Sequence, residues 1–310
     1  MAISISLRRG VCAALALLTL LLPCAFAEEQ EEPLYVENEW NYVDQSMDAT
    51  QGIPEDAVGV MERIQRTGVL RVATEPYFPP QEFIDPNLTG QESYVGADME
   101  MARLIATRMG VALEIVPMEF TEVLDAVADG TCDLAISGLA FTPARAAMVE
   151  LSKGYHYTEN NAGSGLLIRA SDAEKITSAE DLNGLNLVAQ SGSLQESIVA
   201  ERIRNYHEFK RMSSILECYT AVQRGRADAA AVDIENALSY IENNPDCGLA
   251  LVPGVRMIQE EQYDGDRVAA KKGELQLIYF VNSVIDELLA SNQYAQWFEE
   301  YQAYAAKLGM

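Results

Sequence analysis

The sequence has little positive charge and little histidine. Lys and Arg number 22 against 47 Asp and Glu, and the formal net charge of the 310 residues is −25. A surface this acidic repels the phosphates of nucleic acids and of anionic membranes, so we expect neither as a partner. The only histidines are His156 and His207, and no Cys/His spacing is typical of zinc. We therefore expect no metal site and no cofactor.

Long apolar runs are absent except near the amino terminus. Two arginines precede an apolar run over residues 11–22, and the sequence Ala-Phe-Ala ends at Ala27. A basic start, a short apolar stretch and this A-x-A site predict a secretory signal peptide over residues 1–27. We expect an exported protein, in the periplasm or at the cell surface. A lipid anchor at Cys24 is the less favoured alternative, because Pro23 stands where a small residue is usual.

Cysteine is also scarce beyond the predicted signal peptide. The three cysteines there are Cys132, Cys218 and Cys247, and an odd number cannot form a complete disulfide framework. Cys132 precedes an expected strand and Cys218 lies on the apolar side of an expected helix, which favours buried free thiols. A bridge between Cys218 and Cys247 is the alternative that an exported compartment would permit.

The remaining chain divides into a leader and a body. Residues 28–57 hold ten acidic residues and neither Lys nor Arg, which predicts a mobile acidic leader. From residue 58 onward, strand patterns and amphipathic helix patterns alternate, as expected for parallel sheets. We predict two lobes, the first made of residues 58–160 and 265–310, and the second, with the hinge, of residues 161–264.

Two segments have the same pattern and support this division. AVADGTCDLAIS (126–137) and AVQRGRADAAAV (221–232) share A-V-x-x-G-x-x-D, which in each case reads as a helix end, a glycine stop and a buried strand. In open parallel sheets, ligands bind beyond the carboxyl ends of the strands. Arg145 follows the first of these strands and Asp233 ends the second, so the pair predicts a site for a zwitterion.

Arg145 has an unusual position for a cation. Thr142 is a good N-cap and Pro143 suits the first helical residue, so Arg145 falls in the first turn, where the helix dipole favours an anion. The helix dipole therefore disfavours a positive charge at this position, and binding of an anionic group would explain why arginine stands there. A surface ion pair with Glu150 is the alternative.

These residues resemble the amino-acid-binding branch of periplasmic substrate-binding proteins, the family-3 receptors of ABC importers. The resemblance rests on the stretches GVLRVATEPYFPP, GADMEMARLIATRMGV, FTEVLDAVADGTCDLAISGLAFTPARAAMVELS, EDLNGLNLVAQSGS and RADAAAVD, and it runs from about residue 58 to the end. It implies an α/β fold of the two-lobed, type II periplasmic-binding-protein kind. Each lobe would be a mainly parallel sheet flanked by helices, and two hinge strands would join the lobes.

The resemblance also implies roles for individual residues around the ligand's backbone. Arg145 would bind the α-carboxylate together with the backbone N–H groups of Ser193 and Leu194. Asp233 and the carbonyl oxygen of Gly138 would bind the α-ammonium. Helix capping is the alternative role for Ser193 and for Asp233.

Further residues would surround the ligand's side chain. The resemblance implies that Phe78 and Phe120 sandwich it, with core packing as the alternative, and that Glu75 and Gln190 contact its polar end. Ala140 stands where many relatives place Ser or Thr, so one hydrogen bond to the ammonium, about 1.5–3 kcal/mol, would be missing or come from water. Leu194 likewise replaces a smaller or hydroxylated residue.

The function implied is that of a receptor without catalytic activity. It would close around a polar amino acid and deliver it, as a monomer, to the membrane permease of an ABC importer. One alternative is an enzyme similar to periplasmic cyclohexadienyl (prephenate or arogenate) dehydratases, with Glu75 as the candidate general acid. Another is a sensor that keeps the fold without transport.

Overall fold

The structure is a computed structural model that describes residues 59–158, 162–257 and 263–310. All of these residues belong to one unit of the chain, Pro33–Met310. The predicted signal peptide (1–27) and acidic leader (28–57) lie outside the described residues. None of the helices in the described ranges is long and apolar enough to cross a membrane.

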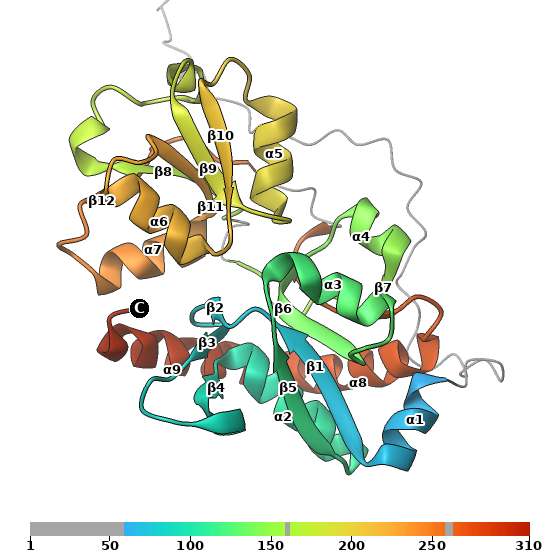
Figure 1. The fold of residues 1–310 in the computed structure, drawn as a ribbon. Coiled ribbons are helices and arrows are strands. Elements are labelled where there is room, and N and C mark those ends of the chain that lie inside the picture. Colours follow the sequence, from blue (N-terminus) through green and yellow to red (C-terminus); the bar gives the residue numbers. More distant parts are fainter. Residues whose placement is uncertain (1–58, 159–161, 258–262) are drawn as a thin grey trace, which may run out of the picture. The chain divides into compact units, whose positions relative to one another are not determined.

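Lobe 1, as we use the term, is built on a five-stranded sheet with the order β5-β1-β6-β13-β7 (Figure 1). Its strands are β1 (Val69–Thr74), β5 (Ala112–Pro117), β6 (Leu134–Ala140), β7 (Val149–Leu151) and β13 (Asp266–Lys271). Strand β1 is parallel to β5 and to β6, which confirms the βαβαβ prediction, whereas β13 runs antiparallel to β6 and β7. A small antiparallel sheet consists of β2 (Tyr77–Phe78), β3 (Glu82–Ile84) and β4 (Tyr94–Val95).

Helices cover both faces of the lobe 1 sheet because its strands carry apolar residues on both sides. The helices are α1 (Val60–Thr67), α2 (Ala97–Met109), α3 (Phe120–Ala128), α4 (Pro143–Met148), α8 (Leu275–Ser291) and α9 (Gln293–Leu308). Leu70 and Val72 of β1 pack in the cluster formed with α2 and α8, while Ala73 packs in the cluster on the α3 side. Helix α2 has 13 residues and ends at Met109, and the following Gly110 has a φ of 70°, which suits glycine.

Lobe 2 is built on a second five-stranded sheet with the order β10-β9-β11-β8-β12. Its strands are β8 (Ser164–Arg169), β9 (Asn186–Gln190), β10 (Glu208–Met212), β11 (Ala229–Asp233) and β12 (Leu249–Leu251). Its helices are α5 (Leu194–Arg202), α6 (Ile215–Gln223) and α7 (Ile234–Asn243), and short 3₁₀ turns lie at Gly90–Ser93 in lobe 1 and at Ala170–Asp172 and Ala179–Leu182 in lobe 2. Helix α5 packs on one face of this sheet, and α6 and α7 pack on the other.

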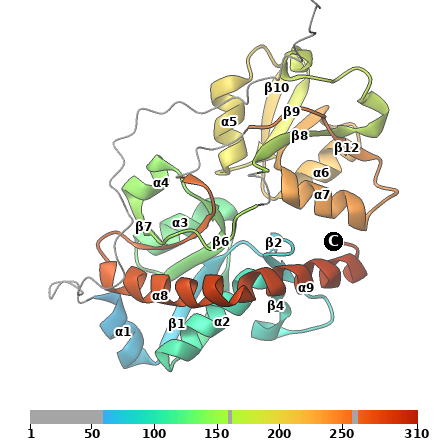
Figure 2. The ribbon, with the colours of Figure 1, turned by 180° about the vertical axis from the view of Figure 1, so that it is seen from behind.

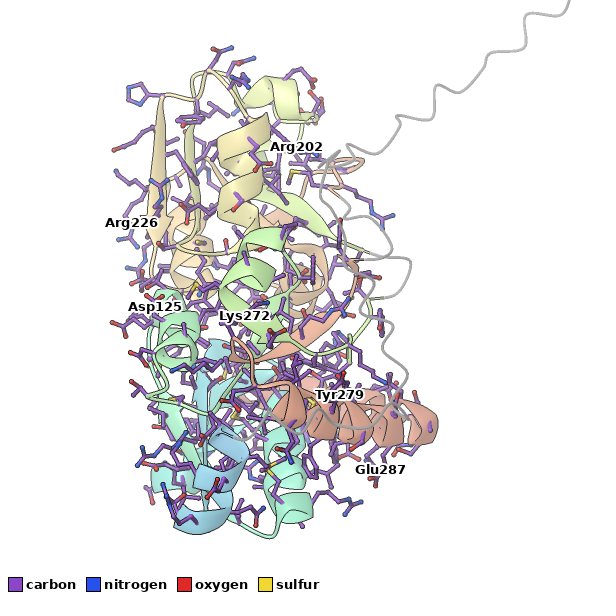
Figure 3. The ribbon with its side chains drawn as sticks, turned by 90° about the vertical axis from the view of Figure 1, so that its right-hand side faces the viewer. Asp125, Arg202, Arg226, Lys272, Tyr279 and Glu287 are labelled. Atoms are coloured by element: carbon purple, nitrogen blue, oxygen red, sulfur yellow. The ribbon has the colours of Figure 1, made fainter. Side chains whose placement is uncertain are left out.

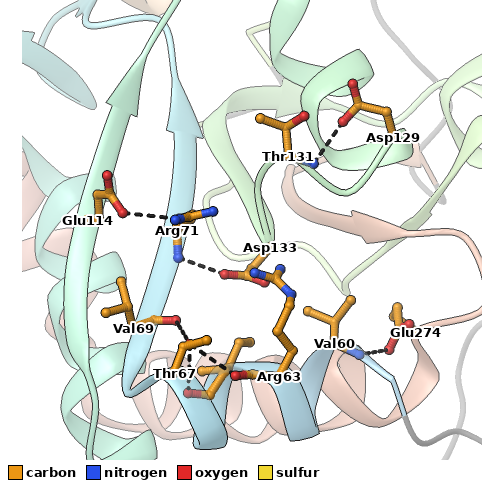
Figure 4. Close-up of polar contacts among 11 residues, drawn as sticks. Val60, Arg63, Thr67, Val69, Arg71, Glu114, Asp129, Thr131, Asp133 and Glu274 are labelled. Carbon is orange, nitrogen blue, oxygen red and sulfur yellow. Dashed lines mark hydrogen bonds and ion pairs between the residues drawn. The ribbon is translucent and has the colours of Figure 1, made fainter.

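The two A-V-x-x-G-x-x-D segments have the same structural role, one in each lobe. Asp133, just before β6, accepts a hydrogen bond from the backbone N–H of Arg71 at 2.8 Å and pairs with Arg63 (Figure 4). Asp228, just before β11, accepts from the N–H of Asn186 at 2.9 Å and pairs with Arg169. Each aspartate therefore ties two parallel strands together at their amino ends, away from the carboxyl ends where ligands bind.

Two segments of chain connect the lobes. Residues 152–158 have no regular structure, and β8 begins only at Ser164. Ser164 forms an isolated bridge with Met257, and Asp266 exchanges backbone hydrogen bonds with Tyr155 and His156 at 3.0 Å. The described parts of the two connections therefore pair with each other. Residues 159–161 and 258–262, which hold much of the predicted hinge strands, lie outside the described residues.

The carboxyl-terminal helices α8 and α9 follow one another along lobe 1 (Figure 2). Phe298 of α9 is buried, and Trp297 packs against the same core, so these aromatic side chains serve packing. The outer faces are charged: Asp125 of α3 and Glu287 of α8 are exposed and point away from the ribbon (Figure 3). Helix α9 also reaches lobe 2, where Asn243 Nδ2 donates to the carbonyl oxygen of Met310 at 2.8 Å.

The three cysteines of the described residues are free thiols. Cys132 and Cys218 are buried, as predicted, and Cys247 is partly exposed. The alternative bridge between Cys218 and Cys247 is not formed. Burial raises the pKa of the Cys132 thiol to about 11, so it stays protonated at neutral pH.

Candidate ligand-binding site

A cavity lies where the carboxyl ends of the parallel strands of both lobes meet. Nine of the ten predicted site residues line it: Glu75, Phe78, Phe120, Gly138, Ala140, Gln190, Ser193, Leu194 and Asp233. Glu75 follows β1, Ala140 ends β6, Gln190 ends β9 and Asp233 ends β11. The topology brings these residues together because all four strand ends face the same space.

Arg145 is the one predicted residue that does not line this cavity. Its side chain lines an adjacent groove, where Nη1 donates to the carbonyl oxygen of Ala140 at 2.7 Å and Nη2 donates to that of Gly192 at 3.1 Å. The guanidinium also lies over the ring of Phe120, 5.5 Å from its centre. Arg145 therefore packs directly behind two residues of the cavity wall and joins the lobes. The alternative pairing with Glu150 is not formed, since Glu150 pairs with Lys272.

The local sequence places Arg145 as its pattern predicts. The Thr142 side chain accepts a hydrogen bond from the Arg145 N–H at 3.1 Å, and Pro143 is the first residue of α4. Arg145 is 8% exposed, and burial lowers the pKa of its guanidinium to about 10, while the charge of Asp266 opposes this shift. Its hydrogen bonds to described residues go to neutral carbonyl oxygens, and a guanidinium has five N–H donors.

Glu75 is a buried acid in the cavity wall. It is 2% exposed, its backbone N–H donates to Ser137 Oγ at 3.0 Å, and within the described residues its Oε1 atom has no hydrogen-bond partner. Burial raises the pKa of Glu75 to about 8, an effect that the Gln190 side chain opposes and the charge of Glu119 reinforces. The carboxyl group is therefore largely protonated at neutral pH unless a cation approaches it.

Gly138 is held in place by a buried network. Its N–H donates to Asp98 Oδ2 at 3.1 Å, and Asp98 also accepts from the hydroxyls of Tyr155 at 2.8 Å and Tyr294 at 2.6 Å. The φ of Gly138 is 51°, and a Cβ atom there would lie 3.2 Å from the ring of Phe78. Glycine is therefore required, and its position is fixed by α2, α9 and the first connection between the lobes.

Phe78 and Phe120 line the cavity and also pack against the core, so core packing does not exclude them from the cavity wall. Phe78 lines the cavity and packs against the core cluster of lobe 2 that contains Tyr219. Phe120 lines the cavity as the first residue of α3 and packs against the core on that side. Each is partly exposed, so each ring offers a face to the cavity while its other side is packed.

The lobe 2 residues are capping groups that also line the cavity. Ser193 Oγ accepts from the N–H of Glu196 at 3.0 Å, and the Ser193 N–H donates to the carbonyl oxygen of Gln190 at 3.3 Å, a long bond. Asp233 Oδ1 accepts from the N–H of Asn236 at 3.0 Å, so it caps α7. Burial raises the pKa of Asp233 to about 6. Capping and cavity lining therefore coexist in both residues.

Ten further polar residues of the cavity wall do not follow from the sequence reasoning, and the best connected of them are Gln81, Glu82, His156, Glu235 and Asp266. Glu82 accepts from Ser137 Oγ at 3.1 Å, and burial together with the charge of Asp98 raises its pKa well above its usual range. Asp266 begins β13, which is antiparallel to β6, and the start of an antiparallel strand lies at the same edge as the ends of its neighbours. The direction of β13 is not visible in a local sequence pattern, so no sequence signal identifies Asp266 as a cavity residue.

His156 joins the first connection to lobe 2. Its Nε2 lies 2.8 Å from Glu235 Oε2, and its ring stacks on that of Phe298 with 4.4 Å between centres. Burial lowers the pKa of His156, but the hydrogen bond with Glu235 and the nearby carboxylates outweigh it, so the net shift is upward. The upward shift favours the positively charged form of His156, which opposes the charge of the acids around it.

Comparisons with known proteins agree with this geometry. Residues 70–303 match the family described as bacterial extracellular solute-binding proteins, family 3. The arginine-binding extracellular protein ArtP of Bacillus subtilis is 28% identical over 169 residues, which are 53% of this chain and 63% of ArtP. That match spans less than two thirds of the length of ArtP.

Two solved structures are similar over most of the chain. The arginine-bound substrate-binding protein AbpA of Streptococcus pneumoniae is 31% identical with a TM-score of 0.69, covering 78% of this chain and 98% of AbpA. The ancestral amino-acid-binding protein AncCDT-1, a precursor of cyclohexadienyl dehydratase, is 26% identical with a TM-score of 0.68, covering 78% and 99%. The type II periplasmic-binding-protein fold is thereby confirmed. This chain belongs to the bacterial extracellular solute-binding proteins, family 3.

Proposed function

We propose that this protein is an extracytoplasmic receptor that binds a cationic amino acid, arginine above all, and delivers it to an ABC importer. The observation that carries the proposal is the charge of the cavity wall. Among the described residues the wall contains six carboxyl groups and neither Lys nor Arg: Glu75, Glu82, Asp233, Glu235, Asp264 and Asp266. Carboxyl groups with raised pKa values ionise when a cation approaches them, so such a wall favours a cation over an anionic solute.

The acids form two groups, which suits a ligand with two positive charges. At the β1 side of the cavity, the charge of Glu75 contributes to raising the pKa of Glu82. At the lobe 2 side, the charge of Glu235 contributes to raising the pKa of Asp233. The charge of Asp233 in turn contributes to raising the pKa of Asp266. Arginine carries a guanidinium at one end and an α-ammonium at the other. We assign the guanidinium to Glu75, whose Oε1 lacks a partner, and the α-ammonium to Asp233.

The α-carboxylate of the ligand is assigned to Arg145. In the structure this side chain lies in the adjacent groove behind Ala140 and Phe120, so binding the carboxylate requires the guanidinium to turn toward the cavity. Its hydrogen bonds to described residues use two of its five donors. A bidentate guanidinium–carboxylate pair shielded from water is among the stronger recognition contacts. The arginine ligand of AbpA, which is similar over 78% of this chain, supports the choice of amino acid.

Delivery to a membrane permease and a monomeric state complete the proposal. Membership of family 3 supports an extracellular or periplasmic location, and the predicted signal peptide agrees with it. Ligand binding would stabilise the arrangement in which both lobes contact the ligand, and the permease would bind that arrangement.

A thermal-shift screen followed by calorimetry tests the proposal. The protein is mixed with each standard amino acid, and we expect arginine to raise the melting temperature most, lysine and histidine less, and glutamate and aspartate not at all. A larger shift with glutamate than with arginine would contradict the assignment of charges. No shift with any amino acid would contradict the receptor function itself.

A dehydratase is the second candidate, because Glu75 is a buried carboxyl group with a pKa of about 8 in the cavity. Such a group stays protonated at neutral pH and can donate its proton to a leaving hydroxyl. Against this stands the charge of prephenate, a dianion that six carboxyl groups disfavour. Incubation with prephenate or arogenate and detection of an aromatic product by ultraviolet absorbance decides between the two, and turnover would favour the enzyme.

A further inference from the structure

Asp266 occupies a central and rigid position in the cavity. Its backbone N–H donates to the carbonyl oxygen of His156 at 3.0 Å, and its carbonyl oxygen accepts from the N–H of Tyr155 at 3.0 Å. It is thus fixed by both connections between the lobes. Its side chain lines the cavity, where Gln81 Nε2 donates to its Oδ2 at 2.7 Å. Within the described residues the carboxylate accepts no other hydrogen bond, which leaves acceptor sites for a ligand.

The register of the sheet places Asp266 directly opposite Ala140. The two residues are Cα partners in the antiparallel pair of β13 and β6, and both line the cavity. Residues paired in this way project their side chains to the same face, with Cβ atoms about 4.5–5.5 Å apart. Ala140 has no hydroxyl to offer an ammonium group, and the carboxylate opposite it is a stronger acceptor than a hydroxyl.

The charges around Asp266 place it at the backbone of the proposed ligand. Its charge favours the protonated form of Arg145, the residue assigned to the α-carboxylate. Burial raises the pKa of Asp266 to about 7, the positive charge of His156 opposes this, and the charges of Asp98 and Asp233 reinforce it. Asp266 therefore lies within electrostatic range of both Arg145 and Asp233.

We infer that Asp266 is a ligand-binding residue that accepts a hydrogen bond from the α-ammonium group of the bound amino acid, in the place of the hydroxyl that Ala140 lacks. This inference rests on the proposed function. The α-ammonium would then have acceptors from both lobes, Asp233 from lobe 2 and Asp266 from the connection next to lobe 1. Gln81 is a positioning residue, because its amide holds the Asp266 carboxylate without itself contacting the ammonium.

The experiment compares two ligands that differ only in the α-amino group. Calorimetry measures the affinity of the full chain for arginine and for 5-guanidinopentanoic acid, which is arginine without that group. Asp266→Asn is nearly isosteric, and we expect it to weaken arginine binding about tenfold to a hundredfold while leaving the affinity for the analogue unchanged. Asp264→Asn, two residues away in the same cavity wall, is the matched control. Any loss it causes is expected to be equal for both ligands.

Two further variants give the test independent readouts. Adding Ala140→Ser to Asp266→Asn supplies the hydroxyl directly opposite position 266, and we expect it to restore part of the lost arginine affinity. Gln81→Ala leaves the carboxylate in place but removes its hydrogen-bond donor. It is expected to weaken arginine binding several-fold with the same selectivity between ligands, so the inference can be judged even if Asp266→Asn does not fold.

The outcomes separate this inference from the proposed function. If the unmodified protein binds neither arginine nor another amino acid, the proposed function is wrong. If it binds arginine but Asp266→Asn lowers the affinity for both ligands equally, the inference is wrong. Asp266 would then act through the electrostatic field of the whole cavity or through the connections between the lobes. If adding Ala140→Ser to Asp266→Asn does not change the arginine affinity, the result would count against the inference that the Asp266 carboxylate takes the place of a hydroxyl at position 140.

Discussion

The guanidinium of Arg145 in lobe 1 donates to the backbone carbonyl oxygen of Gly192 in lobe 2 at 3.1 Å. This contact joins helix α4, which follows β6, to the turn after β9, and the guanidinium also donates to the carbonyl oxygen of Ala140 in the cavity wall. Arg145 therefore has two functions in the proposal: it binds the ligand's carboxylate and it links the lobes. Both depend on the planar, multiply donating shape of the guanidinium.

We predict that Arg145→Ala lowers the affinity for arginine by at least about a hundredfold, or ~3 kcal/mol, because the α-carboxylate loses a charged bidentate partner. Arg145→Lys keeps the positive charge but not the planar pair of N–H donors, so it should retain only a part of the arginine affinity that Arg145→Ala loses. Calorimetry measures both. Arg108→Ala is the control, since Arg108 pairs with Glu287 on the surface. Unchanged affinity in Arg145→Ala, with a native circular dichroism spectrum, would rule out the carboxylate role.

Glu75→Gln is expected to change which amino acid is preferred. The substitution removes the charge that pairs with the ligand's guanidinium but keeps an amide of the same size, so arginine affinity should fall about tenfold or more while glutamine affinity does not fall. The ratio of the two dissociation constants is the measurement. Glu114→Gln, which alters an exposed acid paired with Arg71, should leave that ratio unchanged. An equal loss for both ligands would remove Glu75 from side-chain recognition.

The affinity for arginine is expected to rise with pH between 5.5 and 8. Glu75, Asp266 and Asp233 have pKa values of about 8, 7 and 6, raised chiefly by burial, so protons compete with the cation over this range. Asp266 alone predicts a decrease of roughly thirtyfold from pH 8 to pH 5.5. Calorimetry in two buffers of different ionisation enthalpy counts the protons released.

Charged neighbours of these acids also influence the pH dependence of the arginine affinity. Asp98, Asp233, His156 and Arg145 affect Asp266, and Glu119 affects Glu75. Asp266→Asn should flatten the pH dependence of arginine affinity, whereas substitution of the exposed Asp286 should not. A pH-independent affinity would show that these acids are ionised before the ligand arrives.

The stability of the protein alone should change in the opposite direction with pH. Glu75 has a pKa of about 8 in the folded protein and 4.5 as its ordinary value, so the folded state binds more protons between these values. Stability from this group is fully present below pH 4.5 and decreases as pH rises toward 8. We expect the melting temperature without amino acid to fall over this range, and to fall less in Glu75→Gln. Equal slopes in the two proteins would refute this account.

The paired aspartates at the amino ends of β6 and β11 should matter for stability rather than binding. Asp133 is fully buried, accepts from the Arg71 N–H and pairs with Arg63, so Asp133→Ala leaves a charge and a donor without their acceptor. We predict a loss of about 3 kcal/mol in the free energy of unfolding. Urea denaturation measures it, with arginine affinity retained in the folded fraction. Asp228→Ala is the counterpart in lobe 2, and it should cost less because Asp228 is less buried.

Much of the fold could be predicted because its signals are local. The cap by Thr142 and the glycine stops of the A-V-x-x-G-x-x-D segments each depend on a few neighbouring residues, and the structure confirms them. Nine of the ten candidate residues line the cavity. Pattern alone could locate Asp233, because it stands at the end of a parallel strand, whereas most of the others are candidates only through the resemblance to family-3 receptors.

The sequence by itself determined the alternation of strands and helices, the family, and which strand ends face the site, since these follow from periodicity and short motifs. Only the tertiary structure decided that Arg145 lies behind the cavity wall, that six carboxyl groups share one cavity, and that Asp266 stands opposite Ala140. Residues 140 and 266 are far apart in the chain. The direction of an antiparallel strand and the rotamer of a long side chain depend on packing between distant segments, which no local pattern encodes.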